Sequence, residues 1–323
     1  MVTIQAVGAA SAKGTRPYQQ DTYTLLPPDQ FLPESDPNLA FFAVYDGHGS
    51  EIVSNHASQN LPSLLSQSLT STSTSTSTSL TPESYENAIK QAISSEEQLL
   101  VQEFKNGEAD YAFAGSTLAL VLLDLKSGTL VVGDLGDSKV FLGTLGGNDG
   151  DQVEDVKCLT KSHKPSSPDE KHRIENAGGM VLPDQHEIPR IGALNMSRAL
   201  GDLQYKTPFT NLSVTNPETN EENPLTREQA RAGVEPSEQQ GDFLSSEPDI
   251  TRVNLRQGKK YMLALVSDGV SDSPKVDDEG FIQMLANGFN SGIRGEAVVR
   301  EVINEVVEGV ESDNATCVGL LLQ

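Results

Sequence analysis

Aspartates stand next to several apolar runs in this chain, and most of them lie beside glycine. Asp46 follows the run 41–45 (FFAVY), Asp268 closely follows the run 261–266 (YMLALV), and Asp313 lies just before a third run. Apolar runs of this length, rich in β-branched residues, are typical of buried strands. Carboxylates that converged where such strands meet loops would repel one another unless cations lay between them, and hard oxygen ligands suit Mg²⁺ or Mn²⁺. The pattern indicates a di-metal enzyme.

The Asp-Gly pairs also have a simpler interpretation as turns. Asp-Gly is a common hairpin-turn signal, so at any single position a turn is favoured over a metal ligand. The joint pattern favours the metal site, because the local sequences contain more than a turn requires. They are, in chain order, DGHG at 46–49, GDS at 136–138, SRALGD at 197–202, SDG at 267–269 and DN at 313–314.

Together these motifs closely resemble the protein phosphatase 2C family of metal-dependent serine/threonine phosphatases. The resemblance extends from about Gly14 to Leu322, which is nearly the whole chain. Each short motif alone is weak, whereas the ordered combination is specific. Members of this family share an α-β-β-α sandwich with a metal centre at one end, between the sheets, so the resemblance implies that architecture.

The resemblance implies a set of metal ligands. Asp46 would bridge two ions of Mg²⁺ or Mn²⁺, the backbone carbonyl of Gly47 would be a further ligand of one, and Asp268 and Asp313 would hold the other. A glycine after Asp46 is reasonable, because a bare backbone lets a carbonyl approach an ion. For Asp313 the alternative is a plain turn before a strand, and the family context favours the ligand.

A third, weaker metal site is also implied by the resemblance. Asp137 and Asp272 match positions that, together with Asp268, bind a third ion in several family members. One helical turn would align Asp268 with Asp272, although a loop there is an equal alternative. The SRALGD motif at 197–202 is interpreted as mainly structural.

Three further side chains receive catalytic roles from the resemblance. Arg16, in the segment 14–21 (GTRPYQQD), would grip the substrate phosphate, for which a planar guanidinium is suited, and Asp21 would support a metal-bound water. Gln20 replaces the glutamate of many members, which removes a negative charge from the surroundings of the metals. His48 would be the general acid that protonates the departing alkoxide; packing or capping is the alternative for a lone histidine.

The implied reaction is hydrolysis of phosphoserine or phosphothreonine in proteins. A metal-bridging water or hydroxide would attack phosphorus in line, without a covalent phosphoenzyme. One alternative is a pseudophosphatase that acts as a binding module, which the retained carboxylates Asp46, Asp268 and Asp313 disfavour. A phosphatase of small phosphoesters is the other, and the motifs do not distinguish it.

Composition and charge limit the kinds of partner that the protein is expected to bind. The 323 residues are long enough for one large domain spanning 1–323, and the formal net charge of −23 argues against nucleic acid. There is no apolar run long enough for a transmembrane helix. The resemblance implies that phosphorylated proteins are the substrates, and we expect a monomer inside the cell, in the cytoplasm with the nucleus and mitochondrion left open. Cys158 and Cys317 are expected to be reduced thiols in the core.

The elements that must position these residues follow from the apolar pattern. Strands in hairpin succession, with helices in two pairs, favour an α+β fold of two packed antiparallel sheets flanked by helices. The Thr-Ser tract at 70–79 is expected to be a low-complexity linker, and the polar segment 204–246 a long insertion loop. Thr81, Pro82 and Glu83 predict a helix start. Strands are expected near 39–45 (turning at Asp46-Gly47), 117–125, 129–135, 139–142, 261–266 and 315–322, and helices near 51–65 (kinked or shortened at Pro62), 170–177, 278–286 and 295–308.

Overall fold

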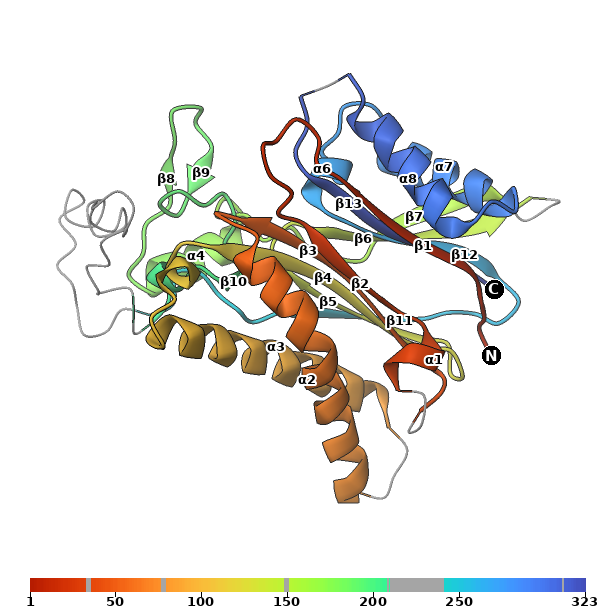
Figure 1. The fold of residues 1–323 in the computed structure, drawn as a ribbon, viewed down its shortest axis with the longest axis horizontal. Helices are drawn as coiled ribbons and strands as arrows, with labels where there is room; N and C mark the ends of the chain where they lie inside the picture. The colour runs from red at the N-terminus through yellow and green to blue at the C-terminus, as the bar shows by residue number, and fades with distance from the viewer. Residues whose placement is uncertain (33–35, 77–79, 148–150, 208, 210–240, 310) are drawn as a thin grey trace.

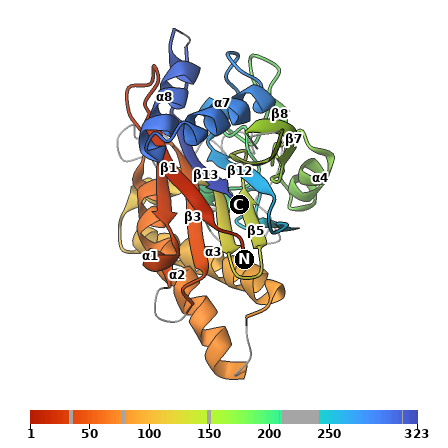
Figure 2. The same cartoon turned by 90° about the vertical axis from the view of Figure 1, so that its right-hand side faces the viewer.

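The computed structural model describes residues 1–32, 36–76, 80–147, 151–207, 209, 241–309 and 311–323. Two antiparallel sheets lie face to face, and a pair of helices covers the outer side of each sheet (Figure 1). This is the predicted α-β-β-α sandwich, and the prediction is confirmed. The two termini lie close together (Figure 2), where the backbones of Thr3 and Gln323 exchange hydrogen bonds of 2.6 and 2.9 Å.

One sheet has the strand order β1-β13-β12-β6-β7, so the first and last strands of the chain are neighbours in it. Helices α7 (Asp278–Asn290) and α8 (Gly295–Val307) cover its outer face. Its strands are β1 (Ile4–Ala12), β13 (Ala315–Leu322), β12 (Lys260–Val266), β6 (Lys139–Gly146) and β7 (Gln152–Cys158).

The other sheet has the order β11-β5-β4-β3-β2, with the short strand β10 (Leu200–Gly201) beside β4. Helices α2 (Ile52–Thr76) and α3 (Pro82–Lys105) cover its outer face. Its strands are β11 (Asp249–Asn254), β5 (Thr129–Leu135), β4 (Gly115–Asp124), β3 (Leu39–His48) and β2 (Thr22–Leu26).

Short elements complete the described chain. A small hairpin of β8 and β9 projects beside α4 in Figure 1, and the single turn of α6 begins at Asp268. The bounds are α1 (Pro28–Phe31), η1 (Ala109–Ala112), α4 (Pro168–Asn176), β8 (Leu182–Pro183), β9 (Pro189–Arg190), η2 (Leu203–Tyr205) and α6 (Asp268–Ser271).

Strand β3 shows why the apolar runs are continuous rather than alternating. Phe42 and Val44 point into the core between the sheets, while Phe41 and Tyr45 point toward helices α2 and α3. Both faces of the strand are buried, so both sets of side chains are apolar. The strand also runs further than predicted, because it pairs with β4 as far as His48. The turn expected at Asp46-Gly47 is therefore wrong.

The Thr-Ser tract differs from the predicted linker. Helix α2 continues through Pro62 to Thr76, so residues 70–76 are helical, and 77–79 lie outside the described residues. Two hydroxyls of the tract bond within the helix: Thr70 Oγ1 donates to the carbonyl of Ser66 at 2.9 Å, and Ser71 Oγ donates to that of Gln67 at 2.8 Å. A polar composition did not prevent the helix from continuing. Helix α3 begins as predicted, with Thr81 as its N-cap.

The segment 204–246 is not a loop throughout. Its described ends are packed: Tyr205 is in η2, and Phe243 and Leu244 are buried in a small core beneath α4. Residues 210–240 lie outside the described residues. Cys317 is buried as predicted, but Cys158 is exposed on the edge strand β7, so the prediction of a core thiol there is wrong. Among the described helices, none has the length and hydrophobicity needed to span a membrane.

Candidate metal centre

Strand ends bring the predicted metal ligands to one end of the sandwich. Asp46 lies near the end of β3, and Asp268 begins α6 immediately after β12. The backbone N–H of Asp268 donates to Asp46 Oδ2 at 3.4 Å, which connects the two sheets. Asp313 directly precedes β13, and Asp137 follows β5. Figure 1 shows α6 and the start of β13 close to the β1–β2 loop, which carries Arg16.

The electrostatics confirm that these carboxylates lie near one another. Burial raises the pKa of Asp46 well above its ordinary value, and Asp21, Asp268, Asp137 and Asp313 raise it further by repulsion. Burial also raises the pKa of Asp268 to about 7, again with a contribution from neighbouring carboxylates. For Asp21 burial raises the pKa to about 6, although hydrogen bonds partly oppose the shift. In the absence of a cation, the fold makes it costly to ionise these groups.

Unpartnered oxygens at the same end fit a cation. Asp21 Oδ1 and Asp137 Oδ1 are buried and have no hydrogen-bond partner in the part of the chain that the structure describes. Asp268, Asp272 and Asp313 line one hollow of about 230 Å³. No three acidic, histidine or cysteine side chains among the described residues form a ready-made cage.

Three basic side chains pair with these acids. Arg16 Nη2 lies 2.6 Å from Asp313 Oδ2, although the Arg16 side chain is 59% exposed. Lys164 donates to Asp137, and Lys139 Nζ lies 3.6 Å from the exposed carboxylate of Asp272. Sequence reasoning found Arg16 but missed both lysines, which no motif distinguishes from ordinary surface lysines. The two predicted ligands of a third ion thus each have a lysine partner.

Asn314 holds the loop that carries Arg16. Its side-chain amide donates to the carbonyls of Lys13 and Tyr18 at 2.8 and 2.9 Å, and its oxygen accepts from the N–H of Gln20 at 2.8 Å. Ser267 Oγ donates to Asp21 Oδ2 at 2.8 Å in the same region. Sequence reasoning gave Asn314 no role of its own.

Gly47 is required by a close approach of two backbones. A Cβ at this position would lie 2.4 Å from the carbonyl oxygen of Gln20 and 2.7 Å from Ser54 Oγ. Any larger residue would therefore displace the strand that carries Asp46. This constraint is separate from the predicted role of the Gly47 carbonyl as a ligand.

His48 has a partner that the sequence did not indicate. Its Nε2 lies 2.6 Å from Asp202 Oδ2, and Asp202 is the last residue of the SRALGD motif. Burial disfavours the charged ring, but the carboxylate of Asp202 outweighs it and raises the pKa of His48 above 6.5. The carboxylate of Asp202 therefore stabilises the protonated ring relative to the neutral ring.

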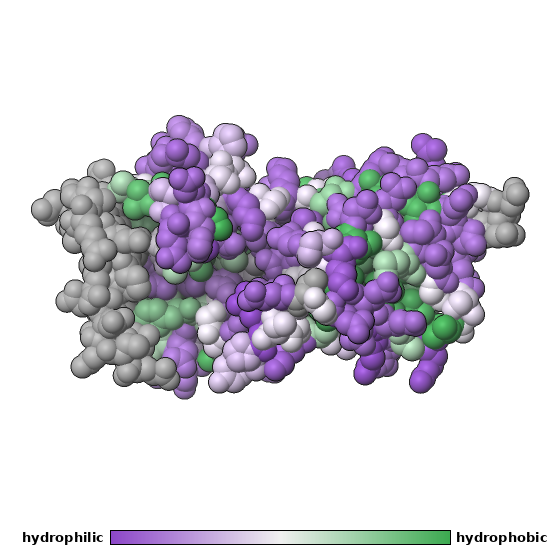
Figure 3. Space-filling model, turned by 90° about the horizontal axis from the view of Figure 1, so that it is seen from above, coloured by the Kyte–Doolittle hydropathy of each residue, from purple (hydrophilic) through white to green (hydrophobic). Residues whose placement is uncertain are grey.

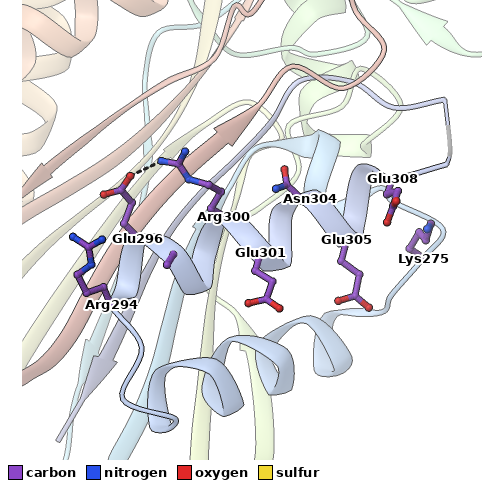
Figure 4. Close-up of a pocket in the computed structure, with 9 residues that line it drawn as sticks. Lys275, Arg294, Glu296, Arg300, Glu301, Asn304, Glu305 and Glu308 are labelled. Carbon is purple, nitrogen blue, oxygen red and sulfur yellow. Dashed lines mark hydrogen bonds and ion pairs between the residues drawn. The ribbon is translucent and has the colours of Figure 1, made fainter.

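The surroundings of the site are polar. Figure 3 shows hydrophilic residues over most of the face that carries α7 and α8, with hydrophobic side chains in small separate patches. A larger hollow of about 880 Å³ lies along the outer face of α8 (Figure 4). Its lining residues all come from the segment 275–308, which contains neither Asp46 nor His48. It is lined by Lys275, Arg294, Glu296, Ala297, Arg300, Glu301, Asn304, Glu305 and Glu308, and it includes none of the predicted site residues.

A two-sheet sandwich between helix pairs, with carboxylates gathered at one end, defines the class of fold that the sequence motifs predicted. The family model described as "Protein phosphatase 2C" matches residues 6–315. The chain therefore belongs to the protein phosphatase 2C family. This confirms the resemblance on which the site prediction was based, while the roles of the individual site residues stay predictions.

Curated relatives carry corresponding names. "Probable protein phosphatase 1N" of Homo sapiens is 28% identical over 312 residues, covering 96% of this chain and 59% of the relative. "Protein phosphatase 1A" of Homo sapiens is 29% identical over 303 residues, covering 93% of this chain and 65% of the relative. The chain thus spans less than two thirds of the length of these relatives.

Solved structures show the same fold. A structure described as "serine-threonine phosphatase 2C from Toxoplasma gondii" matches with a TM-score of 0.71 at 22% identity and covers 99% of this chain and 96% of that chain. A "C.elegans sex determining protein" matches with a TM-score of 0.72, also at 22% identity, and covers 98% of this chain and 64% of that chain. At this identity the similarity shows the fold alone.

Proposed function

We propose that this protein is a metal-dependent phosphatase that hydrolyses phosphoserine and phosphothreonine in proteins. The observation that carries the proposal is the buried acidic cluster around Asp46, whose pKa is raised by burial and by four neighbouring carboxylates. A stable protein tolerates such mutual repulsion most readily where cations bind. Family membership and the names of the relatives support the same reaction.

The proposed ligands of two Mg²⁺ or Mn²⁺ ions are Asp46, the carbonyl of Gly47, Asp268 and Asp313. Asp137 and Asp272 are the proposed ligands of a weaker third ion, which would compete with Lys164 and Lys139 for them. When bound, such ions would supply the Lewis acidity that lowers the pKa of water and neutralises phosphate charge. Asp21 supports the site from its buried position beside Ser267.

Arg16 is the proposed phosphate-binding group. Its guanidinium is largely exposed and pairs with Asp313, so it lies at the acidic end but remains accessible. A planar guanidinium donates two parallel hydrogen bonds to two phosphate oxygens. Asn314 fixes the backbone of this loop, which limits how far Arg16 can move from the site.

His48 is the proposed general acid. The alkoxide of serine or threonine is a poor leaving group unless it receives a proton as its bond to phosphorus breaks. The carboxylate of Asp202 raises the pKa of His48, which stabilises the protonated ring beside the acidic cluster.

The proposal is tested with phosphoserine and phosphothreonine peptides and p-nitrophenyl phosphate, assayed with Mn²⁺ and with EDTA. We expect hydrolysis of the peptides with Mn²⁺ and none with EDTA. Full activity in EDTA would contradict the metal-dependent mechanism. Hydrolysis of p-nitrophenyl phosphate without peptide hydrolysis would favour a phosphatase of small phosphoesters, and Mn²⁺ binding without any hydrolysis would favour a pseudophosphatase.

A further inference from the structure

The SRALGD motif at 197–202 ends at a residue that the sequence left without a function. Asp202 is 1% exposed and adopts a left-handed backbone conformation, with φ 47° and ψ 45°. Its N–H donates to the carbonyl of Ala114 at 2.8 Å, and its carbonyl accepts from the N–H of Tyr205 at 2.9 Å. Residues other than glycine adopt this conformation at an energetic cost, so the surrounding structure must hold Asp202 there.

The segment before Asp202 is fixed by a second buried ion pair. Lys206 Nζ donates to Glu97 Oε1 at 2.7 Å and to the carbonyl of Ala199 at 2.8 Å. The other oxygen of Glu97 accepts from the N–H of Gly201 at 3.1 Å. These bonds connect the segment to helix α3, and they place the carboxylate of Asp202 against His48.

A glycine on the neighbouring strand provides the space for this contact. Gly115 of β4 is the register partner of His48 in β3. A Cβ on Gly115 would lie 2.0 Å from Asp202 Oδ2 and 2.5 Å from His48 Nε2. Any side chain at this position would therefore separate the histidine from the aspartate.

The contact also distinguishes the two ring nitrogens of His48. Nε2 faces the carboxylate of Asp202 at 2.6 Å, whereas Nδ1 has no hydrogen-bond partner among the described residues. A carboxylate accepts hydrogen bonds only, so the proton on Nε2 is held by Asp202. Nδ1, which is buried as well as unpartnered, is then the ring nitrogen that is left to exchange a proton with a group that reaches it.

We propose that Asp202 is a positioning residue of the phosphatase site, which holds the His48 ring through Nε2 so that Nδ1 delivers the proton to the leaving group. The proposal rests on the function proposed above. As a water oxygen bonds to phosphorus, the bond from phosphorus to the serine or threonine oxygen breaks and its electron pair stays on that oxygen. The oxygen takes the proton from Nδ1, which leaves a neutral ring with its Nε2 proton still bonded to Asp202.

The first experiment removes the carboxylate and keeps the backbone conformation. Asp202→Gly tolerates a positive φ, and Asp202→Asn retains an oxygen that accepts from Nε2. We expect Asp202→Gly to lower the turnover of a phosphothreonine peptide by about 10²-fold and that of p-nitrophenyl phosphate by less than about tenfold, because nitrophenolate leaves without a proton. Asp202→Asn should restore part of the peptide activity, and Gly115→Ala should resemble Asp202→Gly.

A matched control uses another histidine–carboxylate pair in the same molecule. His56 Nδ1 lies 2.6 Å from the buried Glu96 Oε1, between helices α2 and α3. Glu96→Gln should change stability without changing the ratio of peptide to p-nitrophenyl phosphate turnover. In a His48→Gln background, Asp202→Gly should cause little further loss, because a residue that acts through His48 has no effect without it. Additive losses, or equal losses on both substrates, would overturn the proposal.

A measurement that does not depend on activity separates this proposal from the proposed function. Nitrogen-15 NMR of the histidine side chains, with the His48 signal assigned from His48→Gln, reports which ring nitrogen carries hydrogen. We expect a hydrogen-bonded Nε2 proton in the wild type, and loss of that signature in Asp202→Gly but not in Glu96→Gln. An unchanged His48 signal in Asp202→Gly would overturn the positioning role. If the signature behaves as expected but no phosphoester is hydrolysed, the proposed function fails and the contact stands.

Discussion

The two ends of the same strands contrast sharply in this molecule. Along most of β3 and β12 the side chains are apolar and fully buried between the layers, as at Val44 and Leu263. A few residues further along, the chain places Asp46 and Asp268 where burial raises the pKa of both carboxylates. Burial stabilises the fold at one end and opposes ionisation at the other.

The difference shows how the fold supports its site. Apolar burial contributes roughly 25 cal/mol per Å² and depends little on direction, so the inter-sheet core provides stability through many equivalent contacts. The acidic end contributes no comparable stability without cations, but its carboxylates lie in or beside the ends of strands that the core keeps rigid. A site on such elements is held more accurately than one on loops alone. We therefore expect substitutions at the two ends to have opposite consequences.

The largest expected difference is between Asp268→Asn and Leu263→Ala. Asp268→Asn removes a proposed metal ligand, so kcat/KM should fall by about 10²-fold or more, while the metal-free protein becomes no less stable. Leu263→Ala leaves a cavity in the core, so the free energy of unfolding should fall by about 2–5 kcal/mol. Urea unfolding in EDTA and peptide kinetics with Mn²⁺ measure the two effects. A metal-free Asp268→Asn protein that was strongly destabilised would break the comparison.

A smaller effect is expected for Arg16, the basic side chain that lies at the acidic end. Arg16→Lys keeps the charge but loses the paired donors, so KM for a phosphopeptide should rise by roughly tenfold. Lys13→Ala is a matched control, because Lys13 is an exposed cation in the same loop whose Nζ contacts only the Pro17 carbonyl among the described residues. Its effect on KM should be within about twofold. A larger rise in KM for Lys13→Ala than for Arg16→Lys would mean that only the overall charge of the loop matters.

The smallest predicted effect concerns pH and Asp134, at the acidic end of β5. Burial raises the pKa of Asp134 from 3.8 to about 7, and this side chain is 1% exposed. The folded state then binds the proton more tightly than the unfolded state, so Asp134 destabilises the fold progressively as pH rises from about 4 to 7. Above pH 7 this cost is complete, and below pH 4 it is absent.

Asp134→Asn should remove this contribution. The free energy of unfolding of metal-free Asp134→Asn is compared with that of metal-free wild type by urea unfolding. The difference in favour of Asp134→Asn should grow by on the order of 1–3 kcal/mol between pH 5 and pH 8. Asn keeps an oxygen that accepts from the N–H of Lys161, the bond that Asp134 Oδ2 makes at 3.1 Å. A stability difference that did not change with pH would show that Asp134 ionises at its ordinary pKa.

The sequence was most informative where local pattern and motif agreed. The apolar runs predicted the strand that carries Asp46 and the strand that ends shortly before Asp268, and the ordered motifs predicted the family and the sandwich. The Thr81 N-cap could be predicted because Pro82 and Glu83, which favour a first helical turn, follow it directly. Local signals of this kind need no knowledge of the tertiary fold.

The errors and omissions share a physical cause. The contact between His48 and Asp202 joins residues 154 positions apart, and it depends on space that Gly115 leaves on a third segment. Composition also misled at residues 70–76, because Ser and Thr hydroxyls bond to carbonyls within their own helix. The exposed Cys158 depends on β7 being an edge strand, which the sequence pattern does not indicate.

The central claim is that the acidic end of the sandwich is a binding site for divalent cations. Calorimetric titration of the metal-free protein with Mn²⁺, repeated on Asp46→Asn, tests it most directly, because Asp46 receives the repulsion of four other carboxylates. We predict saturable binding of two ions to the wild type, with affinity reduced by at least about tenfold in Asp46→Asn. Absence of Mn²⁺ binding to the wild type, or identical titrations of the two proteins, would contradict the claim.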